Sequence, residues 1–347
     1  MPPPLLDGRV LVIPMNSISL FHSILPQPVD TGEAPLGLSA DPWVGAAVGA
    51  LRAIASEAVQ SQHRWNELVA AALCGEAAAV SPPSRRASAA KGSTDVDHVP
   101  APADNGLRAP GPPGPALLWS DLARAGAEMW GLLAAAPALC GAPHGDGHSV
   151  LVIPGLLMDD RHTWPMRSFL ASLGYDVHGW HAGRNRGHWS FVDAELMPAL
   201  QGLRRVSGRK VSIVGASMGG LFARELAARC PDDVRCVVAL GSAAVGPIKA
   251  NNVWPLYEFL TGQPASTLIV PAPPVPSTSV FSRLDGLGDW RTCLQPPGPL
   301  AENIEIVSSH HGMVHHPAAF DILADRLAQP EGRWRPMRRA APRQTQI

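Results

Sequence analysis

The sequence predicts an α/β protein with a mostly parallel central sheet and helices on both faces. From residue 116 to about residue 330, short apolar runs alternate with segments that have the apolar spacing of helices. In addition, the apolar run at 211–214 leads directly into a turn of the pattern Gly-x-Ser-x-Gly and then into a helical segment. Crossovers between parallel strands are right-handed, so helices are expected on both faces of such a sheet.

The alternating region supplies the expected elements. Strands are expected at residues 149–153, 175–179, 211–214, 234–240, 279–282 and 303–307. Helices are expected at residues 116–139, 164–173, 191–204, 218–229 and 317–327. In open parallel sheets, reactive groups gather beyond the carboxyl ends of the strands. The candidate residues below all follow such ends.

Composition divides the rest of the chain. One segment carries many prolines, small residues and charges without a hydrophobic period, which is typical of a linker. An amphipathic helix, which packs on its own protein or on a partner, is expected at 41–60. The expected units are an N-terminal extension at 1–80, the linker at 81–115, the α/β domain at 116–330 with a cap-like insertion at about 246–276, and an arginine-rich tail at 331–347.

Size and charge exclude some classes of protein. The chain has 347 residues, of which 46% are hydrophobic, enough for a substantial core. Its formal net charge of −1, from 28 basic and 29 acidic residues, provides no global field that would attract nucleic acid or an acidic membrane. We therefore expect no nucleic-acid partner, and the oligomeric state stays open.

The cysteines and the N-terminus indicate the compartment. The five cysteines include no Cys-x-x-Cys pair, which argues against a zinc knuckle or a disulfide framework. The N-terminus lacks a basic region followed by a clear cleavage site. No uninterrupted apolar stretch approaches the ~20 residues of a membrane span. The sequence thus predicts a cytoplasmic protein without a transmembrane segment.

The turn at 215–220 carries the strongest chemical signal. Gly215 and Gly219 flank Ser217 two residues away on either side, which lets strand and helix approach without clashes of Cβ atoms. A serine on so sharp a turn projects from the sheet, so Ser217 is a candidate nucleophile. The alternative is an ordinary turn between a strand and a helix.

A serine nucleophile requires a base and a carboxylate that orients the base. Asp285 follows the strand expected at 279–282 and is the favoured acid, whereas Asp289, four residues further on, competes with it. A loop carboxylate is otherwise simply solvated.

Four histidines compete for the role of base. His310 lies closest to the end of the strand expected at 303–307, so it is the residue most able to reach Ser217 across the sheet edge. The others are His311, His315 and His316. The run also invites a metal site, but no carboxylate, cysteine or Glu-x-x-His partner clusters with it. We therefore expect no metal and no cofactor.

Acyl transfer also requires donors for the developing oxyanion. On this kind of fold they are backbone N–H groups, one from the residue after the nucleophile and one from the loop after an earlier strand. Met218 follows Ser217, and Leu156 lies in the loop after the strand at 149–153, where Gly155 allows a tight turn. The predicted oxyanion hole consists of the N–H groups of Leu156 and Met218.

Together these stretches resemble the α/β-hydrolases of the serine esterase and lipase type over roughly residues 140–335. The chain order Ser, Asp, His is the one expected of that superfamily. A bacterial subgroup is similar in a Gly-Arg-Asn segment like that at 183–185 and in an ending like that at 324–330. The resemblance implies a serine hydrolase that cleaves a small-molecule acyl ester through a Ser-His-Asp triad and an acyl-enzyme.

Other interpretations stay open. An acyltransferase would use the same triad to pass the acyl group to an alcohol or a thiol in place of water. A thioesterase would use it to cleave a thioester. A noncatalytic binding protein would keep the fold and dock through the helix at 41–60 or through the arginine-rich tail. The insertion at 246–276 either covers an apolar acyl site or forms a surface loop with its own small core.

Overall fold

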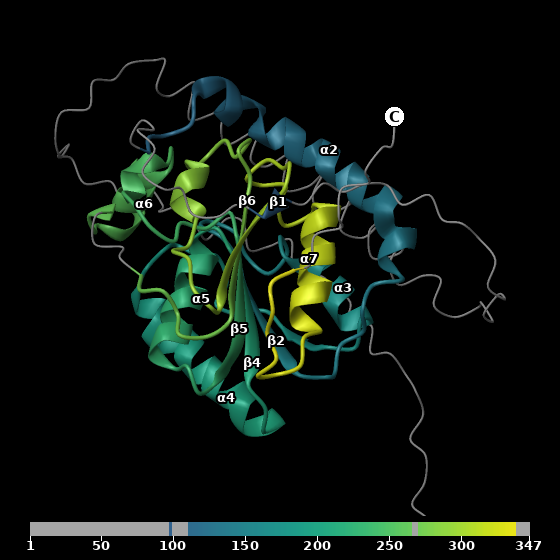
Figure 1. The fold of residues 1–347 in the computed structure, drawn as a ribbon. Helices are drawn as coiled ribbons and strands as arrows, with labels where there is room; N and C mark the ends of the chain where they lie inside the picture. The colour runs from purple at the N-terminus through teal and green to yellow at the C-terminus, as the bar shows by residue number, and fades with distance from the viewer. Residues whose placement is uncertain (1–96, 99–109, 266–269, 338–347) are drawn as a thin grey trace, which may run out of the picture. The chain divides into compact units, whose positions relative to one another are not determined.

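A seven-stranded sheet forms the centre of the computed structural model, which describes residues 97–98, 110–265 and 270–337 (Figure 1). The strands lie in the order β1-β7-β6-β5-β4-β2-β3. Strands β2 to β7 pair in parallel, and β1 runs antiparallel to β7 at one edge. Their bounds are β1 Asp97–His98, β2 Ser149–Ile153, β3 Asp176–His178, β4 Val211–Ala216, β5 Val234–Leu240, β6 Ser277–Phe281 and β7 Ala301–Glu305.

Helices cover both faces of this sheet, which confirms the predicted fold class. In Figure 1, α4 and α5 lie on one face, and α2, α3 and α7 lie on the other. The helix expected at 191–204 begins as a π-helical segment, η2, before α4 continues it. The helical bounds are α2 Pro115–Leu139, α3 Trp164–Ser172, η2 Val192–Leu196, α4 Met197–Ser207, α5 Met218–Arg229, η3 Ile248–Ala250, α6 Trp254–Thr261, η5 Trp290–Cys293 and α7 Pro317–Leu327.

The central strands β2, β4 and β5 are mostly apolar and fully buried because both of their faces pack on a helical layer. In β2, Val150 and Val152 belong to the core beneath α2, α3 and α7, whereas Leu151 and Ile153 belong to the core beneath α4 and α5. A strand that is buried on both faces shows no alternation of polar and apolar residues. This double burial fixes the register of the strands, because a slip by one residue would exchange the two faces.

Strands β6 and β7 begin earlier than their apolar runs predict, at residues 277 and 301 instead of 279 and 303, and end earlier as well. Ser277 and Thr278 at the start of β6 and Glu302, the second residue of β7, are polar but buried. Thr278 Oγ1 donates to Glu302 Oε1 at 2.8 Å, and Arg326 Nη1 of α7 donates to the same oxygen at 2.6 Å. Buried polar groups are tolerated when they are hydrogen-bonded. Because these partners lie on other elements, the local pattern resembled a loop.

Several predicted units lie outside the described residues. These are the extension at 1–80 with its helix at 41–60, most of the linker at 81–115, and residues 338–347 of the tail. Within the linker, β1 pairs with β7, and the helix that follows begins at Pro115. None of the helices in the described ranges is long and apolar enough to cross a membrane.

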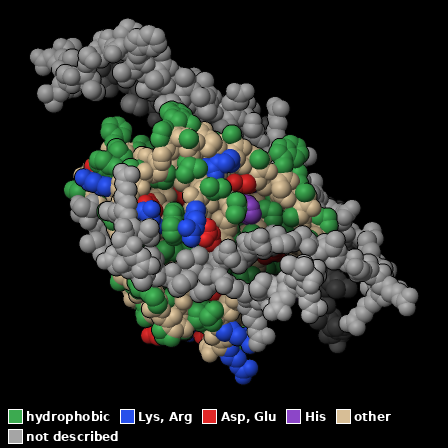
Figure 2. Space-filling view, turned by 45° about the horizontal axis from the view of Figure 1, so that its top comes forward, with side chains coloured by type: hydrophobic (Ala, Val, Ile, Leu, Met, Phe, Trp, Pro, Cys, Tyr) green, Lys and Arg blue, Asp and Glu red, His purple; other side chains and the backbone are tan. Residues whose placement is uncertain are grey.

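Charged side chains of both signs lie interspersed on the described part of the face in Figure 2. This mixture agrees with the nearly balanced number of basic and acidic residues in the chain.

Candidate active site

The chain turns sharply between β4 and α5, and Ser217 lies at the turn. Its φ of 49° and ψ of −117° are strained for a residue with a side chain. The turn requires its glycines, because a Cβ on Gly215 would overlap the carbonyl oxygen of Gly219, and a Cβ on Gly219 would overlap that of Ile153. The N–H of Ser217 donates to the carbonyl of Leu240 at 2.8 Å. The turn thereby carries the serine hydroxyl beyond the sheet edge.

Ser217, His310 and Asp285 lie together at this edge. His310 Nε2 is 3.0 Å from Ser217 Oγ, and His310 Nδ1 is 2.7 Å from Asp285 Oδ2. The other oxygen of Asp285 accepts the N–H groups of Leu287 and Gly288, each at 2.8 Å. If the imidazole carries its proton on Nδ1, as the carboxylate contact favours, Nε2 is free to accept the serine proton. The arrangement therefore has the geometry for proton transfer from serine to imidazole.

The charges around His310 favour its protonated form. Burial lowers the pKa of His310, but the charge and hydrogen bond of Asp285 and the charge of Asp121 outweigh burial and raise the pKa above 6.5. Asp285 is 2% exposed, so solvent screens its charge poorly. The carboxylates of Asp285 and Asp121 thus stabilise the imidazolium that forms when His310 takes a proton.

The rival candidates have other contacts. Asp289 caps the short helix η5, where its Oδ1 accepts the N–H of Arg291 at 3.0 Å. His311 Nδ1 lies 2.6 Å from an oxygen of Asp121. His316 caps α7, where its side chain accepts a backbone N–H. The structure therefore brings only Asp285 and His310 of these candidates to Ser217.

The histidine run at 310–316 does not assemble a metal site in the structure. Among the described residues, no group of three or more His, Cys, Asp or Glu side chains is arranged to hold a metal ion. Burial, together with the charge of His162, lowers the pKa of His315 to about 4, so this imidazole is neutral at physiological pH.

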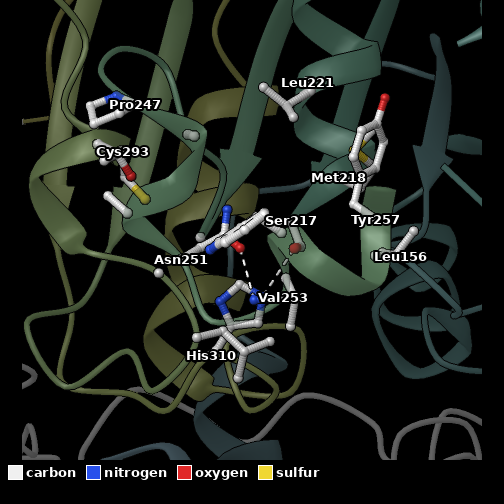
Figure 3. Close-up of a pocket in the computed structure, with 17 residues that line it drawn as sticks. Leu156, Ser217, Met218, Leu221, Pro247, Asn251, Val253, Tyr257, Cys293 and His310 are labelled. Atoms are coloured by element: carbon white, nitrogen blue, oxygen red, sulfur yellow. Dashed lines mark hydrogen bonds between the residues drawn. The ribbon is translucent and has the colours of Figure 1, made fainter. Parts of the chain in front are cut away.

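The two residues of the predicted oxyanion hole lie near the serine. Leu156 and Met218 both line the pocket that contains Ser217, and Figure 3 shows them on the same side of it. Met218 is the first residue of α5, so its N–H is one of the donors that a helix leaves without an intrahelical partner. A helix N-terminus also favours negative charge. Both features suit the stabilisation of an oxyanion beside Ser217.

Asn185 clamps the loop that carries Leu156. Its Nδ2 donates to the carbonyl of Pro154 at 2.8 Å, and its own carbonyl accepts the N–H of Leu157 at 2.6 Å. Asn185 is fully buried, and Leu157 has a positive φ of 61°. Sequence analysis noted the segment at 183–185 but assigned Asn185 no role. A polar residue between glycines was the only signal, and the loop it would hold could not be deduced.

A largely apolar pocket opens beside Ser217. It contains about 660 Å³ of empty space, including its opening to solvent. The insertion supplies one wall through Val253, Trp254 and Tyr257, at the start and on the first turn of α6. Cys293 also lines the pocket, on the side away from Tyr257 (Figure 3). Burial raises the pKa of Cys293 to about 12, so it is a thiol there and not a thiolate.

Sequence analysis also missed two acidic residues of α2. Asp121 and Glu128 lie seven residues apart, so they share one face of the helix. Asp121 is 1% exposed and accepts the backbone N–H groups of Gly286 and His310. Two acids two turns apart on a mostly apolar helix were a visible signal. The loops that they contact were not visible in the sequence.

A comparison with known protein families finds one match. A family model described as a putative esterase matches residues 162–267, a stretch that includes Ser217 but ends before Asp285 and His310. Among curated proteins, none matches the chain.

Among solved structures, several hydrolases are similar to part of the chain. A lipase of Bacillus licheniformis in its mature form is 15% identical, over 55% of this chain and 95% of the other, with a TM-score of 0.42. A naproxen esterase from Bacillus subtilis is 14% identical, over 58% of this chain and 97% of the other, with a TM-score of 0.37. A probable hydrolytic enzyme from Pseudomonas aeruginosa is 15% identical, over 55% and 88%, with a TM-score of 0.40.

The identities and TM-scores of those structures are too low to carry a function over to this chain. The match to the esterase family rests on the sequence itself, and it confirms the resemblance predicted above. The chain is therefore similar to the esterases of the α/β-hydrolase superfamily, as expected for a hydrolase of carboxylic esters.

Proposed function

We propose that the protein is a serine hydrolase that cleaves carboxylic esters with Ser217 as nucleophile, His310 as base and Asp285 as the acid that orients the base. One observation carries the proposal: an unbroken chain of two hydrogen bonds, 3.0 Å and 2.7 Å long, joins these residues at the wall of an apolar pocket. A serine hydroxyl is a weak nucleophile without such a base.

The proposed reaction proceeds in two halves. Ser217 Oγ attacks the ester carbonyl carbon while His310 Nε2 takes the hydroxyl proton. The oxyanion of the tetrahedral intermediate accepts the N–H groups of Leu156 and Met218. Its collapse expels the alcohol, which takes the proton from His310 and leaves an acyl group on Ser217. A water molecule then gives a proton to His310 and attacks the acyl carbonyl carbon. Collapse of this second tetrahedral intermediate breaks the bond to Ser217 Oγ, which takes the proton back from His310, and the acid is released.

The pocket supports an ester with an apolar group near the carbonyl. Its walls include the side chains of Leu156, Leu221, Val253 and Trp254, and few of its polar groups are charged. Rates with p-nitrophenyl esters are expected to rise from the acetate to a medium-chain acyl group. A rate that falls steadily from acetate onward would contradict an apolar acyl site. Faster transfer to an added alcohol or thiol than to water would favour an acyltransferase, which uses the same residues.

A fluorophosphonate probe tests the nucleophile directly. The wild-type protein is expected to react covalently, and Ser217→Ala is expected to lose labelling while its circular dichroism spectrum is unchanged. Ser212→Ala is the matched control, because Ser212 lies in the same strand, β4, but is fully buried. If wild-type protein does not react, or if Ser217→Ala still does, the proposal fails.

The expected cytoplasmic location and small-molecule ester substrate remain predictions. A noncatalytic role would require that Ser217 be unreactive in the folded protein, so the probe also separates that alternative from catalysis.

A further inference from the structure

We propose that Asp121 of helix α2 is a positioning residue that ties the loop of Asp285 to the loop of His310 and so sets the geometry of the proposed triad. The inference rests on the proposed function. Asp121 Oδ2 accepts the N–H of His310 at 2.8 Å and the N–H of Gly286 at 3.1 Å. One carboxylate oxygen thus joins the residue after the triad acid to the triad base.

The second oxygen of Asp121 strengthens the same tie. Asp121 Oδ1 accepts the N–H of His311 at 3.1 Å and lies 2.6 Å from His311 Nδ1. Hydrogen bonds to a carboxylate are about twice as strong as bonds between neutral groups. Asp121 is 1% exposed, so water does not compete for these donors. The carboxylate therefore accepts hydrogen bonds from three backbone N–H groups in two loops.

Residues of both α2 and the loop of Asp285 allow the close contact between them. A Cβ on Gly286 would lie 2.5 Å from the carbonyl oxygen of Leu117 and 2.8 Å from Asp121 Oδ2. Only a glycine lets the loop reach the helix at this distance. Arg124 contributes from the same helix, since its Nη1 donates to the carbonyl of Leu284 at 2.8 Å.

Asp121 is ionised in the folded protein. Burial alone would raise its pKa, but the hydrogen bonds from His311 and from the N–H groups of His310 and His311 outweigh burial and hold the pKa well below the usual range. The charged and titratable groups that face Asp121 and His310 are Asp285, His311 and Arg124, the last with its Nη2 3.5 Å from Asp121 Oδ2. Asp121 therefore places a second negative charge near the imidazole of His310.

Glu128 provides the matched control on the same face of α2. It accepts the hydroxyl of Ser308 and the N–H of Ser309, each at 2.7 Å, and so contacts the base loop just before His310. It makes no described hydrogen bond to the acid loop. At Glu128, burial outweighs the hydrogen bonds and raises the pKa, whereas at Asp121 the hydrogen bonds outweigh burial and lower it. A variant of Glu128 thus perturbs α2 and the base loop without breaking the tie between the two loops.

The test compares Asp121→Asn, Asp121→Glu and Glu128→Gln in steady-state hydrolysis of a p-nitrophenyl ester over a pH series. Asp121→Asn is expected to lower kcat on the order of 10²-fold, because misplaced catalytic groups cost about that much, with little change in KM. Loss of the charge is also expected to move the acid limb of kcat/KM to lower pH. A purely structural residue would not move that limb.

The other two variants separate charge from geometry. Asp121→Glu keeps the charge but displaces the carboxylate, so its acid limb is expected to stay at the wild-type pH while kcat falls on the order of tenfold. Glu128→Gln is expected to keep both the limb and kcat within about twofold of wild type. Circular dichroism of each variant verifies the fold. If Asp121→Asn does not fold, the drop in kcat of Asp121→Glu is the deciding measurement.

The proposal is wrong if Asp121→Asn folds and retains the wild-type kcat and acid limb, or if Asp121→Glu retains the wild-type kcat. Either result leaves the proposed function standing, provided that the wild-type protein reacts with the fluorophosphonate probe. If the wild-type protein does not react, the proposed function fails, and the role of Asp121 in it fails with it.

Discussion

Strand β4 carries Ser212 near its start and is followed by Ser217 just past its end, and each serine bonds to a histidine that bonds to an aspartate. At the starting edge, His148 Nε2 is 2.7 Å from Ser212 Oγ, and His148 Nδ1 is 2.5 Å from Asp146 Oδ1. By residue type and distance alone, this set resembles the one at the opposite edge.

The surroundings of the two serines differ. Ser212 and His148 are both fully buried, and Ser212 lies within a regular strand, whereas Ser217 has a positive φ and lines a pocket. Cys236 Sγ donates to Ser212 Oγ at 3.3 Å, so this hydroxyl has buried hydrogen-bond partners on two other elements. Without a strained turn, a cavity and oxyanion donors, the starting-edge set can only hold strands together.

The pKa values of the two histidines are shifted in opposite directions. Burial lowers the pKa of His148, and the charges of Arg235 and Arg209 lower it further, despite the opposing effect of Asp146. Arg235 Nη1 lies 2.9 Å from Asp146 and 3.1 Å from the ring of His148. Asp146 is therefore shared with cations, whereas no Lys or Arg of the described residues forms an ion pair with Asp285. Contact among a serine, a histidine and an aspartate is therefore not enough to raise the pKa of the histidine. The direction of the shift depends on the other charges around the imidazole.

Substitution of the two aspartates is expected to give the largest difference. Asp285→Asn should lower kcat about 10⁴-fold, because an asparagine neither orients the imidazole nor stabilises the imidazolium. Asp146→Asn should leave kcat unchanged and cost about 1 kcal/mol of stability, since Asp146 is half-exposed and its ion pairs are solvent-screened. Ester hydrolysis and urea unfolding measure the two effects. Comparable losses of kcat in both variants would erase the distinction between the edges.

The pH dependence of the rate sharpens the contrast at His310. Only the neutral imidazole accepts the proton of Ser217, so kcat/KM should fall about tenfold for each pH unit below the pKa of His310. Because Asp285 and Asp121 raise this pKa, the acid limb is expected above pH 6.5. A limb below pH 6 in the wild-type protein would show that burial outweighs the two carboxylates.

The stability of the protein is expected to report on His148. Its folded pKa is lowered, so below about pH 6.5 the unfolded chain binds a proton that the folded protein does not. The free energy of unfolding should then decrease by up to about 1.4 kcal/mol per pH unit until the folded pKa is reached. His148→Gln should remove this part of the decrease, as measured by urea unfolding between pH 7 and pH 5. An unchanged difference between those pH values would place the pH dependence elsewhere, for example at His315.

Much of the α/β fold could be predicted because its signals are local. The apolar runs of β2 and β5 and the helices α5 and α7 have the predicted bounds, since periodicity and turn residues act over a few positions. The early starts of β6 and β7 could not be predicted, because Thr278 and Glu302 are buried by partners on other elements. The contacts of Asp121 were hidden for the same reason.

The residue types at the candidate site follow from local patterns: a glycine-flanked serine after one strand, and an aspartate and a histidine after two later strands. Their selection does not. Asp285 and Asp289 lie four residues apart after β6, whereas Ser212 lies in β4 and Ser217 directly follows that strand. Only the tertiary structure separates them, because the distances, the cavity and the field at each imidazole depend on residues such as Asp121, which is 189 positions from His310 in the chain. Hydrophobic pattern and turn chemistry are short-range, whereas hydrogen-bond geometry and electrostatics act through space.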